Sequence, residues 1–210
     1  MRTQVAKQER AEQTRQRLIE AAAAEFAERG YAGTSLHGIV RSAGVTMGAL
    51  TFHFRSKSAV ADAVHEAGVA ATRALVHDPA PARGLQGVLD TVLALADALR
   101  TTQSIRAAAR LTREGHTTGP GWYDSWAPGL RTALERSWSG ERPDGLTPST
   151  AGSLLFHVLL GVEAAAAAPD AVRTVTGDGP EKSLAHALTA FGTLLATAGS
   201  APAVAPGTLN

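Results

Sequence analysis

Gly44 separates two short segments of apolar periodicity, and this arrangement constrains the fold more than any other feature of the chain. Thr34 or Ser35 can cap a helix before the glycine, and Thr46 can cap a helix of about 47–52 after it. The inward-facing residues of the first helix would be Leu36, Ile39, Val40 and Ala43. A glycine between two such helices lets them cross steeply, as in a helix-turn-helix, although an ordinary helical corner has the same pattern.

The rest of the chain also favours helices. Alanine, the strongest helix former, supplies 42 of the 210 residues, and aromatic residues make up only 5%. We therefore predict an all-α protein whose helices are separated by glycine and proline. Gly30 should end the first helix, Pro148 suits a first turn, and Pro128 should kink or shorten the start of its helix. The expected helices are 9–29, 36–43, 47–52, 57–76, 85–100, 103–114, 122–139, 149–168 and 181–198, with a mobile tail at 201–210.

Several classes of protein are excluded or disfavoured. The absence of cysteine excludes a disulfide framework, a zinc finger and an iron–sulfur site. The histidines lack metal-ligand spacing, and no acid–base pair or phosphate-binding glycine loop is recognisable, so we expect no catalytic residues, metal or cofactor. An α-helical enzyme remains a remote alternative. The apolar run 151–168 contains His157 and Glu163, and no secretory signal is apparent, so we expect a cytoplasmic protein without a membrane span.

Charge is distributed unevenly along the chain. Residues 1–60 contain nine basic and five acidic side chains, whereas the remainder contains eleven basic and fourteen acidic ones. A basic N-terminal module on a mildly acidic body indicates a polyanion partner for the first part. Surface charge also fluctuates by this amount without any function.

Residues 9–58 carry a longer pattern than the turn alone. The matching positions are Phe26-Ala-Glu-Arg-Gly30-Tyr31, Thr34, Ile39, Ala43-Gly44-Val45, Gly48, Leu50, His53-Phe54 and Lys57. This stretch resembles the TetR family of one-component bacterial repressors. The resemblance implies a three-helix DNA-binding domain at 1–56, containing the helix-turn-helix, and a helical ligand-binding and dimerisation domain at 57–200.

A finer resemblance is to the γ-butyrolactone receptor subgroup. It is carried by Ala11-Glu-Gln-Thr-Arg15, Gly48-Ala-Leu, Phe52-His-Phe54, Arg106-Ala-Ala-Ala-Arg110-Leu111 and Trp126. The resemblance implies a homodimeric repressor that binds a pseudo-palindromic, double-stranded DNA operator at antibiotic-biosynthesis genes. A small lactone or furan inducer would release it. The alanine-rich segments 149–168 and 181–198 suit a four-helix dimer interface, although a monomeric helical core would look similar.

Two sets of residues follow for these sites. Thr46 and Lys57 would hold phosphates, Met47 and Gly48 would face bases or sugars, and His53 would either contact phosphate or pack beneath its helix. The expected DNA-binding residues are Thr46, Met47, Gly48, Thr51, His53 and Lys57. An indole wall suits a small ring with carbonyl groups, although core filling is the simpler interpretation. The expected ligand-binding residues are Trp126, Tyr123, Trp122, Leu89, Val92, Leu93, Arg110, Leu111, Phe156 and Leu160.

Three departures from the subgroup affect both sites. Met47 stands where the subgroup usually has lysine, and Thr51 stands where it usually has tyrosine. Gly68 replaces the usual glutamine on the fourth helix, which the resemblance places near the ligand. These changes keep an alternative open, in which the chain is a pseudo-receptor of the same fold that responds to an antibiotic or an intermediate.

Overall fold

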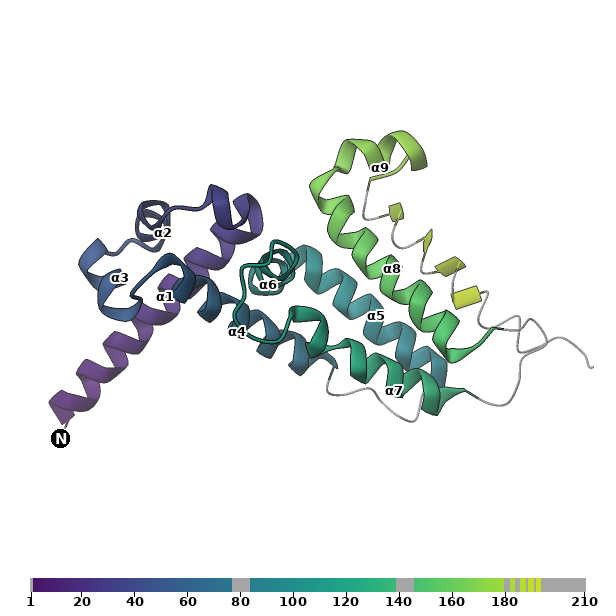
Figure 1. Ribbon diagram of the computed structural model, residues 1–210, viewed down its shortest axis with the longest axis horizontal. Coiled ribbons are helices and arrows are strands. Elements are labelled where there is room, and N and C mark those ends of the chain that lie inside the picture. Colours follow the sequence, from purple (N-terminus) through teal and green to yellow (C-terminus); the bar gives the residue numbers. More distant parts are fainter. Residues whose placement is uncertain are drawn as a thin grey trace, which may run out of the picture. The chain divides into compact units, whose positions relative to one another are not determined.

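The computed structural model describes residues 2–76, 84–138 and 146–179, together with scattered positions between 182 and 193 (Figure 1). Within these ranges the chain forms helices and no strand, which confirms the predicted all-α class. Two compact units are distinguished: one combines residues 1–78 with 94–129, and the other combines 79–93 with 130–210. The expected DNA-binding domain, residues 1–56, lies within the first unit.

The first three helices form as the local sequence signals predict. Helix α1 spans Arg2–Gly33 and starts earlier than expected, but Gly30 interrupts its helical geometry with φ 68° and ψ −178°. Helix α2 spans Leu36–Ala43, and the Ser35 hydroxyl accepts a hydrogen bond from the Gly38 N–H at 3.0 Å. Gly44 ends α2 in the left-handed conformation at φ 63°, and Thr46 caps α3, which spans Met47–His53. The turn therefore has helix-turn-helix geometry.

Helix α4, Lys57–Val76, packs against α6, Gln103–Arg113, and both contact α1. Gly68 is buried at the α4–α6 contact: a Cβ added there would lie 2.3 Å from the Ser104 carbonyl oxygen and 2.5 Å from the Ala108 Cβ. The smallest side chain thus lets the two helices approach each other closely. The α6 backbone occupies the space beside Gly68, and the expectation that this position lies near a ligand stays a prediction.

The segment around the tryptophans is not the single helix expected over 122–139. A short 3-10 helix, η2, covers Trp122–Ser125, and α7 covers Ala127–Ser137. Pro128 lies in the first turn of α7, because proline lacks the N–H that a helix interior requires. Before it, α5 spans Gly84–Thr101.

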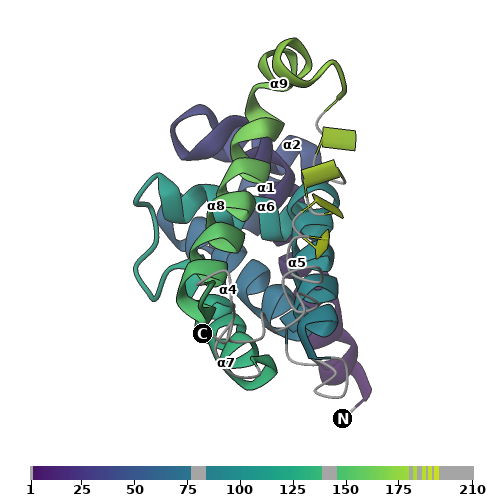
Figure 2. The same cartoon turned by 90° about the vertical axis from the view of Figure 1, so that its right-hand side faces the viewer.

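The second unit contains α8, Pro148–Ala167, and α9, Pro169–Thr176, which contact each other (Figure 2). Pro148 starts α8 behind the cap Thr147, as expected, whereas α9 was not predicted. Most of the expected helix 181–198 and the tail 201–210 lie outside the described residues. Among the described helices, none is both long and apolar enough for a membrane span.

Gly68→Ala should reduce the free energy of unfolding by about 1–3 kcal/mol, because the added methyl group would have to displace the α6 backbone. Gly48→Ala is the matched control, since a Cβ there would lie 3.8 Å from the Thr46 hydroxyl oxygen and alanine favours the helix. Urea titration of both variants measures the difference. A Gly68→Ala protein as stable as Gly48→Ala would contradict the close approach.

Candidate DNA-binding surface and ligand-binding residues

Helix α3 is fixed by the side chains that it turns inward. Leu50 and Phe54 are fully or almost fully buried, and Met47 packs against the same core that α1, α2 and α4 form. The opposite side of α3 carries Gly48 and Thr51, both exposed. The helix therefore presents a short outward surface on a rigid base, which is the arrangement that a DNA-reading helix requires.

The predicted DNA-binding residues differ in their exposure. Thr46, Gly48 and Thr51 are exposed, and the Thr46 hydroxyl accepts a hydrogen bond from the Ala49 N–H at 3.2 Å. His53 is half-buried beside the Phe52 ring. The Met47 side chain is half-buried against the core, and its expected place against bases or sugars stays a prediction. The roles of the others in DNA binding stay predictions.

Lys57 has a specific contact within the protein. Its Nζ lies 4.3 Å from the centroid of the Tyr31 ring, a cation–π distance. The Tyr31 ring also stacks on His116 at 4.0 Å, so residues from α1, α4 and the loop after α6 meet at one aromatic side chain. This contact fixes the start of α4, immediately after the DNA-reading helix.

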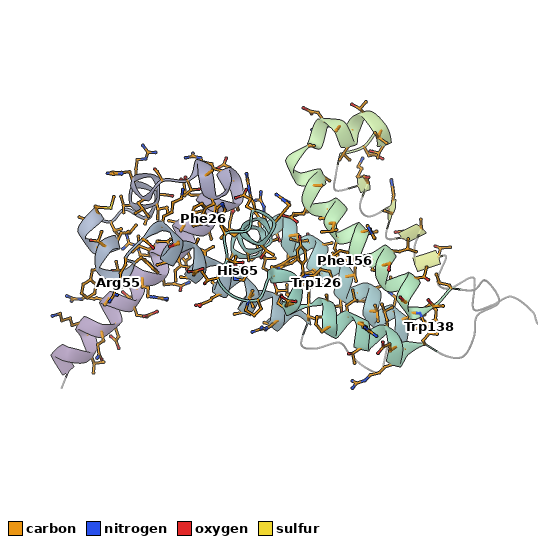
Figure 3. The ribbon with its side chains drawn as sticks, viewed as in Figure 1. Phe26, Arg55, His65, Trp126, Trp138 and Phe156 are labelled. Atoms are coloured by element: carbon orange, nitrogen blue, oxygen red, sulfur yellow. The ribbon has the colours of Figure 1, made fainter. Side chains whose placement is uncertain are left out.

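Sequence reasoning missed two side chains at this surface. Phe52 is 79% exposed and points away from the core. Arg17 donates a hydrogen bond to the Ala43 carbonyl at 2.8 Å and so holds the end of α2. The helical spacing of Phe52 from the buried Leu50 could have indicated its direction. The Arg17 contact links residues 26 positions apart, and no local pattern shows it. Figure 3 shows Arg55, another candidate phosphate contact, just after α3.

A pair of side chains from the end of α6 holds the turn of α1 at Gly30. The Arg110 Nε donates a hydrogen bond to the Glu114 carboxylate at 2.9 Å. The Arg110 Nη1 donates to the carbonyl oxygens of Ala27, at 3.1 Å, and Glu28, at 2.9 Å. The other carboxylate oxygen of Glu114 accepts from the Tyr31 N–H at 2.7 Å. We call this group the α1–α6 clasp. The Arg110 guanidinium is directed to α1, and ligand binding by this residue stays a prediction.

The clasp also changes the acidity of Glu114. Partial burial opposes its charge, but the Tyr31 N–H and the charged Arg110 guanidinium favour the carboxylate more strongly, so the pKa of Glu114 is lowered. The folded state is therefore stabilised by this group above its ordinary pKa of 4.5, and the contribution is lost as the pH falls through the lower pKa of the folded protein.

The predicted indole wall lies in the first unit. Trp122 and Trp126 are both buried, with ring centroids 5.6 Å apart, and Tyr123 is half-buried beside them. The Trp122 indole N–H donates to the Thr72 hydroxyl at 2.8 Å, and its backbone N–H donates to the Thr112 hydroxyl at 2.9 Å. Trp122 is thus a polar link between α4, α6 and η2. Figure 3 shows Trp126, which remains the candidate wall residue.

His65 extends this buried group of polar side chains. Its Nε2 lies 3.2 Å from the Thr112 hydroxyl, at the centre of α4 (Figure 3). Burial lowers the pKa of His65, although the carboxylates of Asp62 and Glu66 act in the opposite direction. The neutral imidazole is therefore favoured in the folded protein, and sequence reasoning had not selected this residue.

The other predicted ligand-binding residues are divided between the two units. Leu111 is part of the core that supports the DNA-reading helices, and its assignment to the ligand site stays a prediction. In the second unit, Leu89 and Val92 are buried and Leu93 is exposed. Phe156 and Leu160 are half-buried on α8. For these five residues of α5 and α8, ligand contact stays a prediction.

Comparison with known proteins agrees with this geometry. The model of the tetR family of bacterial regulatory proteins matches residues 18–64, which contain the helix-turn-helix. The A-factor receptor protein of Streptomyces griseus is 34% identical over 165 residues, 76% of this chain and 57% of that protein. This chain thus spans little more than half of that relative's length.

Solved structures extend the similarity beyond the N-terminal helices. A crystal structure of a γ-butyrolactone receptor, an ArpA-like protein, is 31% identical and has a TM-score of 0.62, covering 73% of this chain and 78% of the other. CprB from Streptomyces coelicolor, in complex with its biological operator sequence, is 27% identical with a TM-score of 0.60, covering 87% and 97%. The fold and site define a bacterial helix-turn-helix regulator. The chain belongs to the TetR family and is related to the γ-butyrolactone receptors.

Glu114→Gln should cost about 1–2 kcal/mol of unfolding free energy at pH 7, because it removes a charge that Arg110 and the Tyr31 N–H stabilise. The difference from wild type should shrink as the pH falls below 4.5, where the unfolded chain takes up a proton, and vanish below the lower pKa of the folded protein. Urea unfolding at a series of pH values measures both effects.

Glu135→Gln is the matched control, because Glu135 also pairs with an arginine four residues earlier at 2.9 Å but is exposed. Such an exposed pair should contribute little to stability, because solvent and salt screen the two charges. Equal effects of the two substitutions, or a Glu114→Gln effect that does not depend on pH, would show that the clasp adds nothing to an ordinary surface ion pair.

Proposed function

We propose that the chain is a repressor that binds a pseudo-palindromic operator as a homodimer and that a γ-butyrolactone or a related lactone or furan releases it. Control of antibiotic biosynthesis is part of this proposal. The observation that carries it is the exposed outer side of α3, held by the buried Leu50 and Phe54. Support comes from the A-factor receptor relative and from the solved CprB–operator complex.

Several groups near α3 suit the DNA backbone. Helix α3 starts directly after its exposed cap, Thr46. The N–H groups at the start of a helix attract phosphate. Arg41 and Arg55 are exposed on either side of α3 in the sequence, and Lys57 follows. These side chains would position the helix in the major groove without selecting a base sequence.

Dimerisation would use the outer side of α8. Ala151, Leu155 and Leu159 are buried on one side of this helix. The residues exposed on the other side are Ser153, Leu154, His157, Gly161 and Ala164. Mostly small side chains permit close approach of a second copy, and Leu154, 46% exposed, would gain burial there. Two-fold symmetry would then match a two-fold operator.

Release would act through α4. This helix begins at Lys57 beside the DNA-reading helix and is joined to Trp122 through Thr72. A ligand against Trp126 would disturb the adjoining Trp122 ring, 5.6 Å away between centroids, and so displace α4. It can shift the protein only by the difference between its affinities for the released and the DNA-bound forms.

The departures from the subgroup favour a second candidate, the pseudo-receptor. At Gly68, the α6 backbone occupies the space into which a glutamine side chain would extend. The Thr51 hydroxyl, where tyrosine is usual, donates to the Gly48 carbonyl at 3.2 Å. A receptor altered at Gly68 would respond to a different small molecule, such as an antibiotic or an intermediate, whereas the change at Thr51 would alter a DNA contact of α3 without abolishing DNA binding.

Lys57→Ala should weaken binding to all duplexes by a similar factor and flatten the dependence of log affinity on log salt by about 0.9 per lost phosphate contact. Fluorescence anisotropy with a duplex that the wild-type protein selects from a random-sequence pool measures the slope. Lys57→Arg is the control, since it retains both the charge and the contact with the Tyr31 ring. If Lys57→Ala lowers the melting temperature but not the slope, Lys57 only packs on Tyr31.

Trp126→Leu should leave duplex affinity within about twofold but raise the concentration of synthetic γ-butyrolactone needed for release by about tenfold or more, because it removes the indole wall. Since Trp126 is buried, the variant should also lose about 2–4 kcal/mol of stability. Trp126→Phe, which retains an aromatic ring, keeps the test valid if the leucine variant fails to fold. When binding of the lactone is followed by tryptophan fluorescence, Trp138→Phe is the control variant. An unaltered release by both Trp126 variants would remove this residue from the ligand site.

A further inference from the structure

The outward side of α3 has an unusual chemistry for a DNA-reading helix. With 100° between successive residues, the buried Leu50 and Phe54 define the inner side, and Phe52 lies diametrically opposite to them. Gly48, four residues earlier, shares the side of Phe52 and leaves open space beside it. If α3 enters the groove with this side leading, the Phe52 ring is its most projecting group.

The neighbouring side chains offer few hydrogen bonds to bases. Gly48 has none, and the Thr51 hydroxyl already donates to the Gly48 carbonyl. The outward arc of Gly48, Thr51 and Phe52 thus contains no guanidinium, ammonium or amide group, which are the groups that read guanine and adenine edges. The apolar feature that the major groove displays is the C5-methyl group of thymine.

The Phe52 ring is also held in place. It is the one aromatic ring among the large hydrophobic side chains that stand exposed in the described part of the chain. The centroids of the His53 and Phe52 rings lie 5.0 Å apart, and the ring planes form an angle of 84°, which is an edge-to-face contact. A ring with a restricted position loses less entropy when it is covered.

We propose that Phe52 reads thymine by packing on its C5-methyl group in each half-site, so that sequence selection by α3 is mainly apolar. The inference rests on the proposed operator binding. It assigns a base-reading role to a residue that would otherwise expose a large apolar surface to water without a function. Contact with sugars or phosphates would cover the same ring but would give no preference for thymine.

The test replaces thymine with uracil, which lacks only the methyl group. The wild-type protein first selects duplexes from a random-sequence pool, and their half-site thymines are then replaced with uracil. Binding should weaken about fourfold for each contacted methyl group. A duplex with uracil only outside the half-sites is the DNA control. Placing 5-methylcytosine, but not cytosine, at a contacted position should restore part of the affinity, because it returns the methyl group.

Phe52→Ala should bind the thymine and uracil duplexes equally, and Phe52→Leu should retain part of the preference. Because Phe52 is exposed, both variants should melt within a few degrees of wild type. Equal binding of both duplexes by the wild-type protein would overturn the inference and leave operator binding intact. The inference would also be overturned, with operator binding intact, if Phe52→Ala kept the full preference for the thymine duplex over the uracil duplex, even with a lower affinity for both. If the wild-type protein selects no duplex, the proposed function itself fails.

Discussion

The α1–α6 clasp is the interaction on which the rest of the first unit depends. At Gly30, φ 68° turns the chain, and a Cβ there would lie 2.3 Å from the Glu114 carboxylate and 2.8 Å from the Arg110 guanidinium. The Glu114 carboxylate and the Arg110 guanidinium can therefore occupy these places only because residue 30 is a glycine. Because the guanidinium also binds the carbonyls of Ala27 and Glu28, just before the Gly30 turn, α6 fixes the helix against which α2 and α3 are packed.

Helix α6 also packs against α4. It therefore contacts both α1 and α4, the two helices that position α3. At Gly68 the backbones of α4 and α6 meet without an intervening side chain. Trp122 joins the C-terminal parts of the two helices through its hydrogen bonds to Thr72 and Thr112. Lys57 and His116 meet on Tyr31 close to the clasp. A displacement of α6 or α4 by a ligand would therefore act on α3 through the clasp, the contacts on Tyr31 and the buried core that holds Leu50 and Phe54. Packed contacts of this kind have two discrete arrangements more readily than a continuous range.

The features that the sequence predicted are those that neighbouring residues determine. Ser35, Gly44 and Thr46 form caps and a turn through bonds that span a few residues, so their pattern is sufficient. The break at Pro128 was expected as a kink or a shortened helix start, and the structure has a separate η2 before α7, with Trp122 and Trp126 buried. Arg110 was assigned to a ligand because its partners on α1 are more than 80 residues away. The direction of Phe52 could have been inferred from its helical spacing to Leu50, whereas its degree of exposure, 79%, required the packed structure.

The central claim, that α3 from each of two copies reads one half of a symmetric site, can be tested most directly by hydroxyl-radical footprinting. The full-length protein would be bound to a duplex that it selects from a random-sequence pool. The account predicts two protected regions, related by a two-fold axis and centred about one helical turn, or a multiple of it, apart. A synthetic lactone that releases the protein should remove both together. A single unsymmetric footprint, or none at any protein concentration, would contradict the account.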